Sequence, residues 1–171
     1  MGWRGFLLAF VCLSIVALPG CGFRLRGSAE LPATIDTLSI QAGNPYSELV
    51  ANLRRALQSG GLSIVDDPKE ADAVLRIRGE STGRRVQSIS AGGKVREYEL
   101  QYTVSFNATD REGRETVAPQ TITLTRDYIF DETAVLGTGE EEALLYRDMR
   151  QQAVAQILRR LQAGYASSGP Q

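Results

Sequence analysis

Six basic residues lie between positions 76 and 96, accompanied by a single acid, Glu80, which gives this segment a local charge of +5. They are Arg76, Arg78, Arg84, Arg85, Lys94 and Arg96. Most of them are arginines, whose planar guanidinium fork binds phosphate oxygens in pairs. The segment is therefore a candidate binding site for a phosphorylated ligand. The alternative is that these are ordinary surface arginines, which increase solubility or form ion pairs.

Cys21 is the second candidate for chemistry, because it follows a leader typical of secreted proteins. The chain begins with one basic residue, Arg4, and an apolar run over residues 6–18, which is too short to span a bilayer. The sequence Leu18-Pro19-Gly20-Cys21 resembles the bacterial lipobox, in which the cysteine is diacylated and becomes the new N-terminus. Pro19 departs from the small residue usual at its position. The alternative is plain secretion with a free thiol.

Acylation of Cys21 would anchor the protein to a membrane without a spanning helix, because two or three acyl chains bind a bilayer stably where one does not. Gly22 follows the cysteine, where an aspartate would indicate retention in the inner membrane. We therefore expect a signal peptide over residues 1–20, a lipidated N-terminus and tether over 21–34, and an outer-membrane location.

Conventional catalysis has little support in the composition of the 171-residue chain. Histidine is absent, and the only cysteines are Cys12 and Cys21. This excludes Ser-His-Asp and Cys-His catalysis, histidine-ligated zinc and a disulfide framework, and no cofactor is expected. The net charge of −1 gives no overall attraction to nucleic acid.

The middle of the chain has the pattern of long strands. From residue 96 to residue 108, apolar and polar side chains alternate, apart from Arg96 at the start of the apolar series, which predicts a strand with one buried face. The segment 73–89 before it and the threonine-rich segment 121–130 after it are also strand-like. The sequence Ser90-Ala91-Gly92-Gly93 predicts the first turn, and residues 110–114 predict the second. Short strands are expected near residues 38–40 and 62–65.

Two helices flank these strands. Asn44 and Pro45 predict the start of the first, and Gly60-Gly61 predicts its end. A capping box at Thr138-Gly139-Glu140-Glu141 predicts the start of the second. We expect one α+β domain over residues 35–162, a two-layer sandwich in which two helices pack on one face of a mostly antiparallel sheet of four to five strands. Residues 163–171 are expected to be a disordered tail.

These features together resemble the LPS-assembly lipoprotein family, LptE. The resemblance rests on the lipobox followed by Gly22-Phe23-Arg24-Leu25-Arg26, on the long central strands, and on Leu136-Gly137 followed by Glu141-Glu142, Leu145, Met149 and residues 157–161. It implies a small α/β sandwich without enzymatic activity that forms a heterodimer with the outer-membrane β-barrel LptD, assists its assembly and plugs its lumen. It also implies a part in delivering lipopolysaccharide (LPS) to the outer leaflet.

The resemblance gives two surfaces of the predicted domain a role. Because LPS carries phosphates, the six basic residues are candidates for binding its phosphate groups. The alternating polar side chains of the long strands would face the polar lumen of a barrel, although an ordinary solvated sheet face has the same pattern.

Two other functions remain open. An envelope lipoprotein that activates or scaffolds a peptidoglycan synthase, or another envelope complex, needs the same anchor, tether and small domain. An envelope hydrolase or amidase would need paired carboxylates, although paired acids at turns are usually helix caps or solvated charge. The candidate carboxylates are Asp66, Asp67, Asp127, Asp131 and Glu132.

Overall fold

The computed structural model describes residues 35–130 and 135–167, with the side chains of residues 139–166 in its last helix. The elements are β1 (Thr37–Ala42), α2 (Glu48–Ser59), β2 (Ser63–Ile64), β3 (Ala73–Ile89), β4 (Val95–Asp110), β5 (Glu115–Ile129) and α3 (Val135–Ser167). Cys21, the predicted leader and tether, Asp131 and Glu132 lie outside the described residues.

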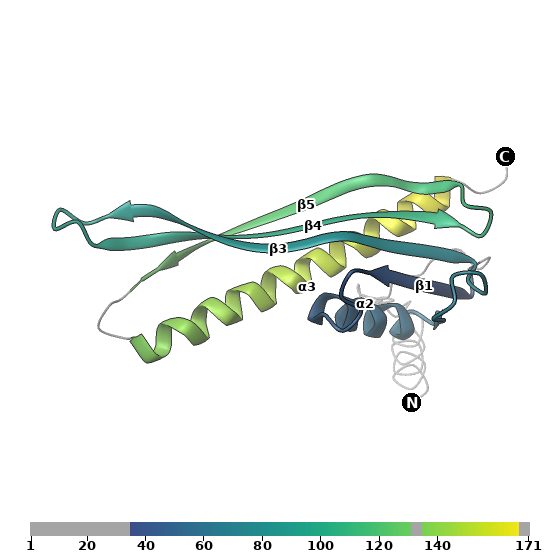
Figure 1. Ribbon diagram of the computed structural model, residues 1–171, viewed down its shortest axis with the longest axis horizontal. Helices are drawn as coiled ribbons and strands as arrows, with labels where there is room; N and C mark the ends of the chain where they lie inside the picture. Colours follow the sequence, from purple (N-terminus) through teal and green to yellow (C-terminus); the bar gives the residue numbers. More distant parts are fainter. Residues whose placement is uncertain (1–34, 131–134, 168–171) are drawn as a thin grey trace, which may run out of the picture.

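The strands form one sheet in the order β2-β1-β3-β4-β5. The three long strands are antiparallel, whereas β1 runs parallel to both of its neighbours, β2 and β3. Both helices lie on one face of the sheet (Figure 1). The predicted α+β sandwich is therefore confirmed, and its five-stranded sheet is mixed, because β1 is parallel to its neighbours while the long strands are antiparallel.

The alternation along β4 sets which face is buried. Leu100, Tyr102, Val104, Phe106 and Ala108 have no exposed surface, and they pack with side chains of α2 and α3. Of the described elements, none packs on the opposite face of the long strands. Thr121, Thr123 and Thr125 of β5 are exposed on that face, as the sequence predicts.

A bulge in β3 changes the side on which its later residues point. The pairing with β4 shifts between Ile77 and Gly79, so that Gly79 lies opposite Ser105. A Cβ atom at Gly79 would lie 3.1 Å from the Ser105 hydroxyl, which explains a small residue there. Because the alternation is interrupted, residues 79–86 do not continue the face pattern set by residues 73–77.

The first helix begins later than the sequence indicated. The side chain of Asn44 accepts a hydrogen bond from Tyr46 N (3.0 Å) and so forms a local turn instead of capping the helix. Ser47 is the N-cap, and its hydroxyl accepts from Val50 N at 3.3 Å. The predicted end is confirmed, because Gly60 is the C-cap and Gly61 has a φ of +93°.

The second helix is longer than predicted at both ends. It begins at Val135, so Thr138 lies inside the helix and is not its cap. It ends at Ser167, so the predicted tail at 163–171 is wrong for its first five residues, and its last four lie outside the described residues. Tyr165 is 7% exposed, and its hydroxyl donates to Thr109 O at 3.0 Å. Burial of this aromatic ring stabilises a last turn that the local sequence does not predict.

Candidate functional site

The β3–β4 hairpin extends beyond the start of α3 and forms one end of the molecule, here called the tip (residues 86–97 with Ile129 and Phe130) (Figure 1). Its turn is held by Ser90 N, which donates to Lys94 O at 2.7 Å, and by Lys94 N, which donates to the Ser90 hydroxyl at 3.2 Å. Gly93 has a φ of +80°, which a residue with a Cβ atom rarely adopts. The tip is thus a hydrogen-bonded turn at the end of two long paired strands.

The surface of the tip combines apolar and basic side chains. Val86, Ile89 and Ile129 are 52%, 64% and 72% exposed, and they are three of the few large apolar side chains at the surface among the residues that the structure describes. A hollow of about 560 Å³ lies beside Ile129, between the start of β4 and the end of β5. Its lining includes Lys94, Arg96 and Phe130. Exposed apolar groups beside cations are suited to an amphipathic anion such as a phosphorylated lipid.

The six basic residues do not form one continuous patch. Arg76 lies nearer the other end of β3, where it donates to Gln41 Oε1 (3.0 Å) and Thr109 Oγ1 (3.1 Å). Eight residues along a strand correspond to about 26 Å, so Arg76 is far from Arg84. Arg78 is exposed in the bulge and lines a separate hollow near the start of α2. Sequence alternation had placed Arg76 and Arg78 on one face, and the bulge removes that relation.

The part of the β3–β4 hairpin from Gly83 to Leu100 is here called the hairpin arm. Its four basic residues are divided between the two faces of the sheet. Arg84 lies opposite Leu100 on the helix-facing side, and Arg85 lies opposite Glu99 on the other side. Arg85 forms an ion pair with Glu99 at 2.8 Å. Lys94 and Arg96 are exposed at the tip. Lys94 and Arg96 therefore lie together at the tip, and Arg84 lies on the helix-facing side about 20 Å along the hairpin from Lys94, while Arg85 is paired on the opposite face.

Arg84 lies in a cluster of aromatic and acidic side chains that sequence reasoning missed. Its guanidinium carbon lies 4.5 Å from the centre of the Tyr98 ring, and its NH1 lies 3.1 Å from Glu142 Oε2 of α3. Tyr98 in turn meets the Phe130 ring edge-on at 5.6 Å. The signal available in the sequence was the alternation itself, which places residues 98, 128 and 130 on the helix-facing side.

A second contact joins α3 to the same arm. The Tyr146 hydroxyl donates to Gly83 O at 2.7 Å. Burial raises the pKa of the Tyr146 hydroxyl, and the nearby Glu142 carboxylate raises it further, so the group stays protonated and remains a donor. Glu142 and Tyr146 are one helical turn apart, and both reach the hairpin arm.

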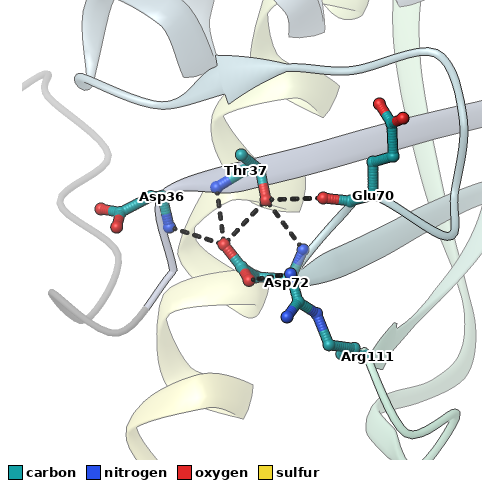
Figure 2. Close-up of polar contacts among 5 residues, drawn as sticks. All are labelled: Asp36, Thr37, Glu70, Asp72 and Arg111. Atoms are coloured by element: carbon teal, nitrogen blue, oxygen red, sulfur yellow. Dashed lines mark hydrogen bonds and ion pairs between the residues drawn. The ribbon is translucent and has the colours of Figure 1, made fainter.

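The opposite end of the sheet, here called the base, is organised by Asp72 (Figure 2). Asp72 Oδ2 accepts from Asp36 N (3.1 Å), Thr37 N (2.9 Å) and the Thr37 hydroxyl (2.7 Å). Its other oxygen pairs with Arg111 of the β4–β5 turn at 2.9 Å. The hydrogen bonds from Thr37, above all that from its hydroxyl, lower the pKa of the Asp72 carboxyl. The start of β1 is thus fixed at the base, away from the tip.

A polar network crosses the middle of the domain. Arg150 of α3 pairs with Glu48 at the start of α2, and its Nε lies 3.7 Å from Glu80 of β3. The Tyr102 hydroxyl donates to Glu80 Oε1 at 2.8 Å. Burial, followed by the bond to Glu80, raises the pKa of Tyr102. This network joins both helices to the sheet and holds the long hairpin in register with them.

The carboxylates considered for hydrolysis do not form a catalytic pair in the described part of the chain. Asp67 caps a turn by accepting from Lys69 N at 2.9 Å, and Asp66 is a solvated partner of Arg54 at 3.8 Å. Asp127 is exposed on β5. Among the residues that the structure describes, no cluster of three or more acidic, histidine or cysteine side chains has the arrangement of a metal site. Within the same residues, no helix combines the length and the apolar character needed to cross a bilayer.

The chain is similar to known proteins in sequence and in fold. Residues 35–161 match the family described as "LptE: Lipopolysaccharide-assembly". Proteins named "LPS-assembly lipoprotein LptE" from Pectobacterium atrosepticum and Yersinia enterocolitica are 32% and 30% identical, covering 87% and 94% of this chain and 80% and 77% of their own lengths.

Two solved structures share the fold. Lipoprotein B from Nitrosomonas europaea has a TM-score of 0.72 at 33% identity, covering 86% of this chain and 94% of the other. The rare lipoprotein B from Shewanella oneidensis has a TM-score of 0.70 at 30% identity, covering 78% of this chain and 99% of the other. The chain therefore belongs to the lipopolysaccharide-assembly family, LptE.

Proposed function

We propose that this protein is a non-enzymatic outer-membrane lipoprotein that forms a heterodimer with the LptD β-barrel, assists its assembly, plugs its lumen and takes part in delivering LPS to the outer leaflet. The observation that carries the proposal is the position of the amphipathic tip at the end of the sheet opposite to the base. Because β1 begins at the base, the chain that precedes it, with the predicted anchor at Cys21, joins the domain there.

The length of the sheet fits this arrangement. β3 has 17 residues, which at about 3.3 Å each span roughly 56 Å from base to tip. The hydrocarbon core of a bilayer is about 30 Å thick, and a bilayer with its headgroup regions is about 40–45 Å. With Cys21 acylated in the inner leaflet and the domain inside a barrel, the tip reaches the level of the outer leaflet.

The outer surface of the sheet supports the plug role. Large barrels have polar interiors, and a folded plug needs a polar exterior over its own core. Gln101, Thr121, Thr123 and Thr125 are exposed on the face that no described helix covers, and Arg85 pairs with Glu99 there. Such a face can form hydrogen bonds with a polar lumen wall.

LPS binding is proposed for the tip and the adjoining part of the hairpin, through Arg84, Lys94 and Arg96 together with the exposed Ile89. The other basic residues of the original set, Arg76, Arg78 and Arg85, are assigned no direct contact, because they lie far from the tip or pair on the opposite face. LPS combines phosphates with acyl chains, which matches cations beside apolar groups.

Co-purification tests the barrel partnership. The full-length protein, extracted from membranes in non-ionic detergent, should co-purify with an equimolar amount of a β-barrel protein of much larger mass. Recovery of a peptidoglycan synthase instead would favour the scaffold role, and substrate turnover by the isolated protein would favour the hydrolase. Globomycin or Cys21→Ala should accumulate the uncleaved precursor, and no effect of either would contradict the lipid anchor.

Charge reversal tests the LPS contact. Arg84→Glu, Lys94→Glu and Arg96→Glu together should weaken LPS binding most strongly at low salt, because exposed charges are screened at high salt. Arg76→Glu with Arg78→Glu, two charge reversals elsewhere on β3, is a control for general electrostatics and should weaken it less. Equal binding by the wild type and the tip variant would remove the tip from the mechanism.

A further inference from the structure

The strongest unassigned feature beside the tip is the contact between Arg84 of β3 and Glu142 of α3. The guanidinium carbon of Arg84 lies 4.5 Å from the centre of the Tyr98 ring, a cation–π contact that leaves the N–H groups of the guanidinium to bind an anion. Glu142 pairs with these groups through the 3.1 Å contact with NH1. An arginine placed to bind a ligand phosphate is thus already neutralised by an acid from a different element, α3.

We propose that Glu142 is a built-in counter-ion that a lipid phosphate displaces from Arg84, and that this displacement loosens the first turns of α3 from the hairpin. The inference rests on the proposed binding of LPS at the tip and the adjoining part of the hairpin. It adds a residue that sets the affinity of the site and a conformational consequence of occupying it.

The exposure of the pair makes the exchange feasible. The Arg84 side chain is 47% exposed and that of Glu142 is 25% exposed, so the ion pair is weak and open to competition from solvent. A phosphomonoester carries a charge of about −1.5 to −2 and three acceptor oxygens, against a single charge for the carboxylate. It is therefore the stronger partner for the same N–H groups.

The consequence for α3 follows from where Glu142 is attached. Two polar contacts between described residues join the first turns of α3 to the hairpin arm: Glu142 with Arg84, and Tyr146 with Gly83 O. Loss of the first removes one of these two contacts and leaves the other, together with the packing of Leu145 and Tyr146. Phosphate binding at Arg84 should then weaken the docking of the start of α3 on the hairpin, and this docking should weaken phosphate binding by the same factor.

The ion pair of the neighbouring Arg85 is not coupled to the docking of α3. Arg85 pairs with Glu99, and both residues belong to the sheet, so an anion that displaced Glu99 would not release a helix. The difference between the neighbouring arginines lies in the element that supplies the counter-ion.

The test uses the full-length protein in non-ionic detergent, titrated with purified LPS and with the same LPS after phosphatase treatment. Glu142→Gln should tighten LPS binding by about 3-fold, and by no more than about 5-fold, as loss of a competing exposed ion pair predicts. Glu141→Gln, an exposed neighbour on the same helix, removes an equal charge and is the control for general electrostatics. In the Arg84→Ala background, Glu142→Gln should give no gain.

Hydrogen exchange provides a readout that a change in charge alone would not move. LPS should increase amide exchange over residues 140–147 in the wild type, Glu142→Gln should show faster exchange without ligand, and Arg84→Ala should show no ligand effect. Dephosphorylated LPS should have none of these effects. Inorganic phosphate at the same phosphate concentration should not displace LPS, because it lacks the acyl chains.

The outcomes separate the counter-ion from the proposed function. If Arg84→Ala weakens LPS binding but Glu142→Gln behaves like Glu141→Gln, the counter-ion role is wrong and the binding site stands. If Arg84→Ala leaves LPS binding unchanged, both are wrong. Equal binding of dephosphorylated LPS, or displacement by inorganic phosphate, would also overturn the assignment of a lipid phosphate.

Discussion

Replacing Asp72 tests how the base of the domain is held. In Asp72→Ala, the Thr37 amide and hydroxyl lose their acceptor, and Arg111 loses its partner. Hydrogen bonds to a charged group contribute about 1.5–3 kcal/mol each and are not additive within one site. Because the side chain is about a quarter exposed and water replaces part of the loss, we expect about 2–3 kcal/mol of destabilisation at pH 7.

The effect should depend on pH in a defined direction. The pKa of Asp72 is lowered in the folded state, so the carboxylate stabilises the fold above the unfolded-state pKa of 3.8. That stabilisation is lost as the pH falls through the folded-state pKa. The difference between wild type and Asp72→Ala should therefore be constant near neutral pH and shrink below about pH 4.

Urea unfolding at pH 7 and at pH 3 is the assay, with Asp36→Asn as the control. Asp36 is an exposed neighbour whose backbone, not its side chain, bonds to Asp72. The control should change the free energy of unfolding by less than about 0.5 kcal/mol. An Asp72→Ala difference that is equal at both pH values, or absent at both, would refute the reasoning.

Three further substitutions test the packing of α3 and the buried network, each by thermal or urea unfolding. Gly164→Ala should cost about 1–3 kcal/mol, because its Cβ atom would lie 2.4 Å from Thr116 O and α3 would have to move away from β5; an unchanged midpoint would contradict this close approach. Tyr165→Phe should cost about 1 kcal/mol, since its buried hydroxyl donates to a carbonyl of β4, and wild-type stability would mean that the last helical turn is not docked. Tyr102→Phe should cost about 1–3 kcal/mol through loss of the bond to Glu80, and a neutral result would indicate that water replaces it.

Periodicity predicted the long strands well because one physical cause dominates there. The apolar positions of β4 from Leu100 to Ala108 are buried against the helices, so burial fixes both the strand and its register. β3 was predicted with its observed bounds, Ala73–Ile89, because turn residues end it on both sides. The bulge at Gly79 was not predicted, since a shifted pairing depends on the neighbouring strand and leaves little local signal.

Helix ends and the candidate site were harder to predict. Asn44 is a good N-cap residue by type, but its side chain is used in a turn, and Ser47 caps instead. The last turn of α3 depends on the burial of Tyr165, a tertiary effect. The charge count found the basic segment, but it did not show that Arg84 and Arg85 point to opposite faces or that Glu142, 58 residues away, neutralises one of them.

Crosslinking in cells tests the central claim most directly. A photoreactive amino acid at Thr123, on the exposed sheet face, should form an adduct with an outer-membrane barrel much larger than this chain. The same group at Arg55, on α2, serves as a second position that reports how much of the domain the barrel encloses. We expect the Thr123 adduct to contain LptD. An adduct with a peptidoglycan synthase, or none at either position with the protein free in the periplasm, would contradict a function based on fitting inside a barrel.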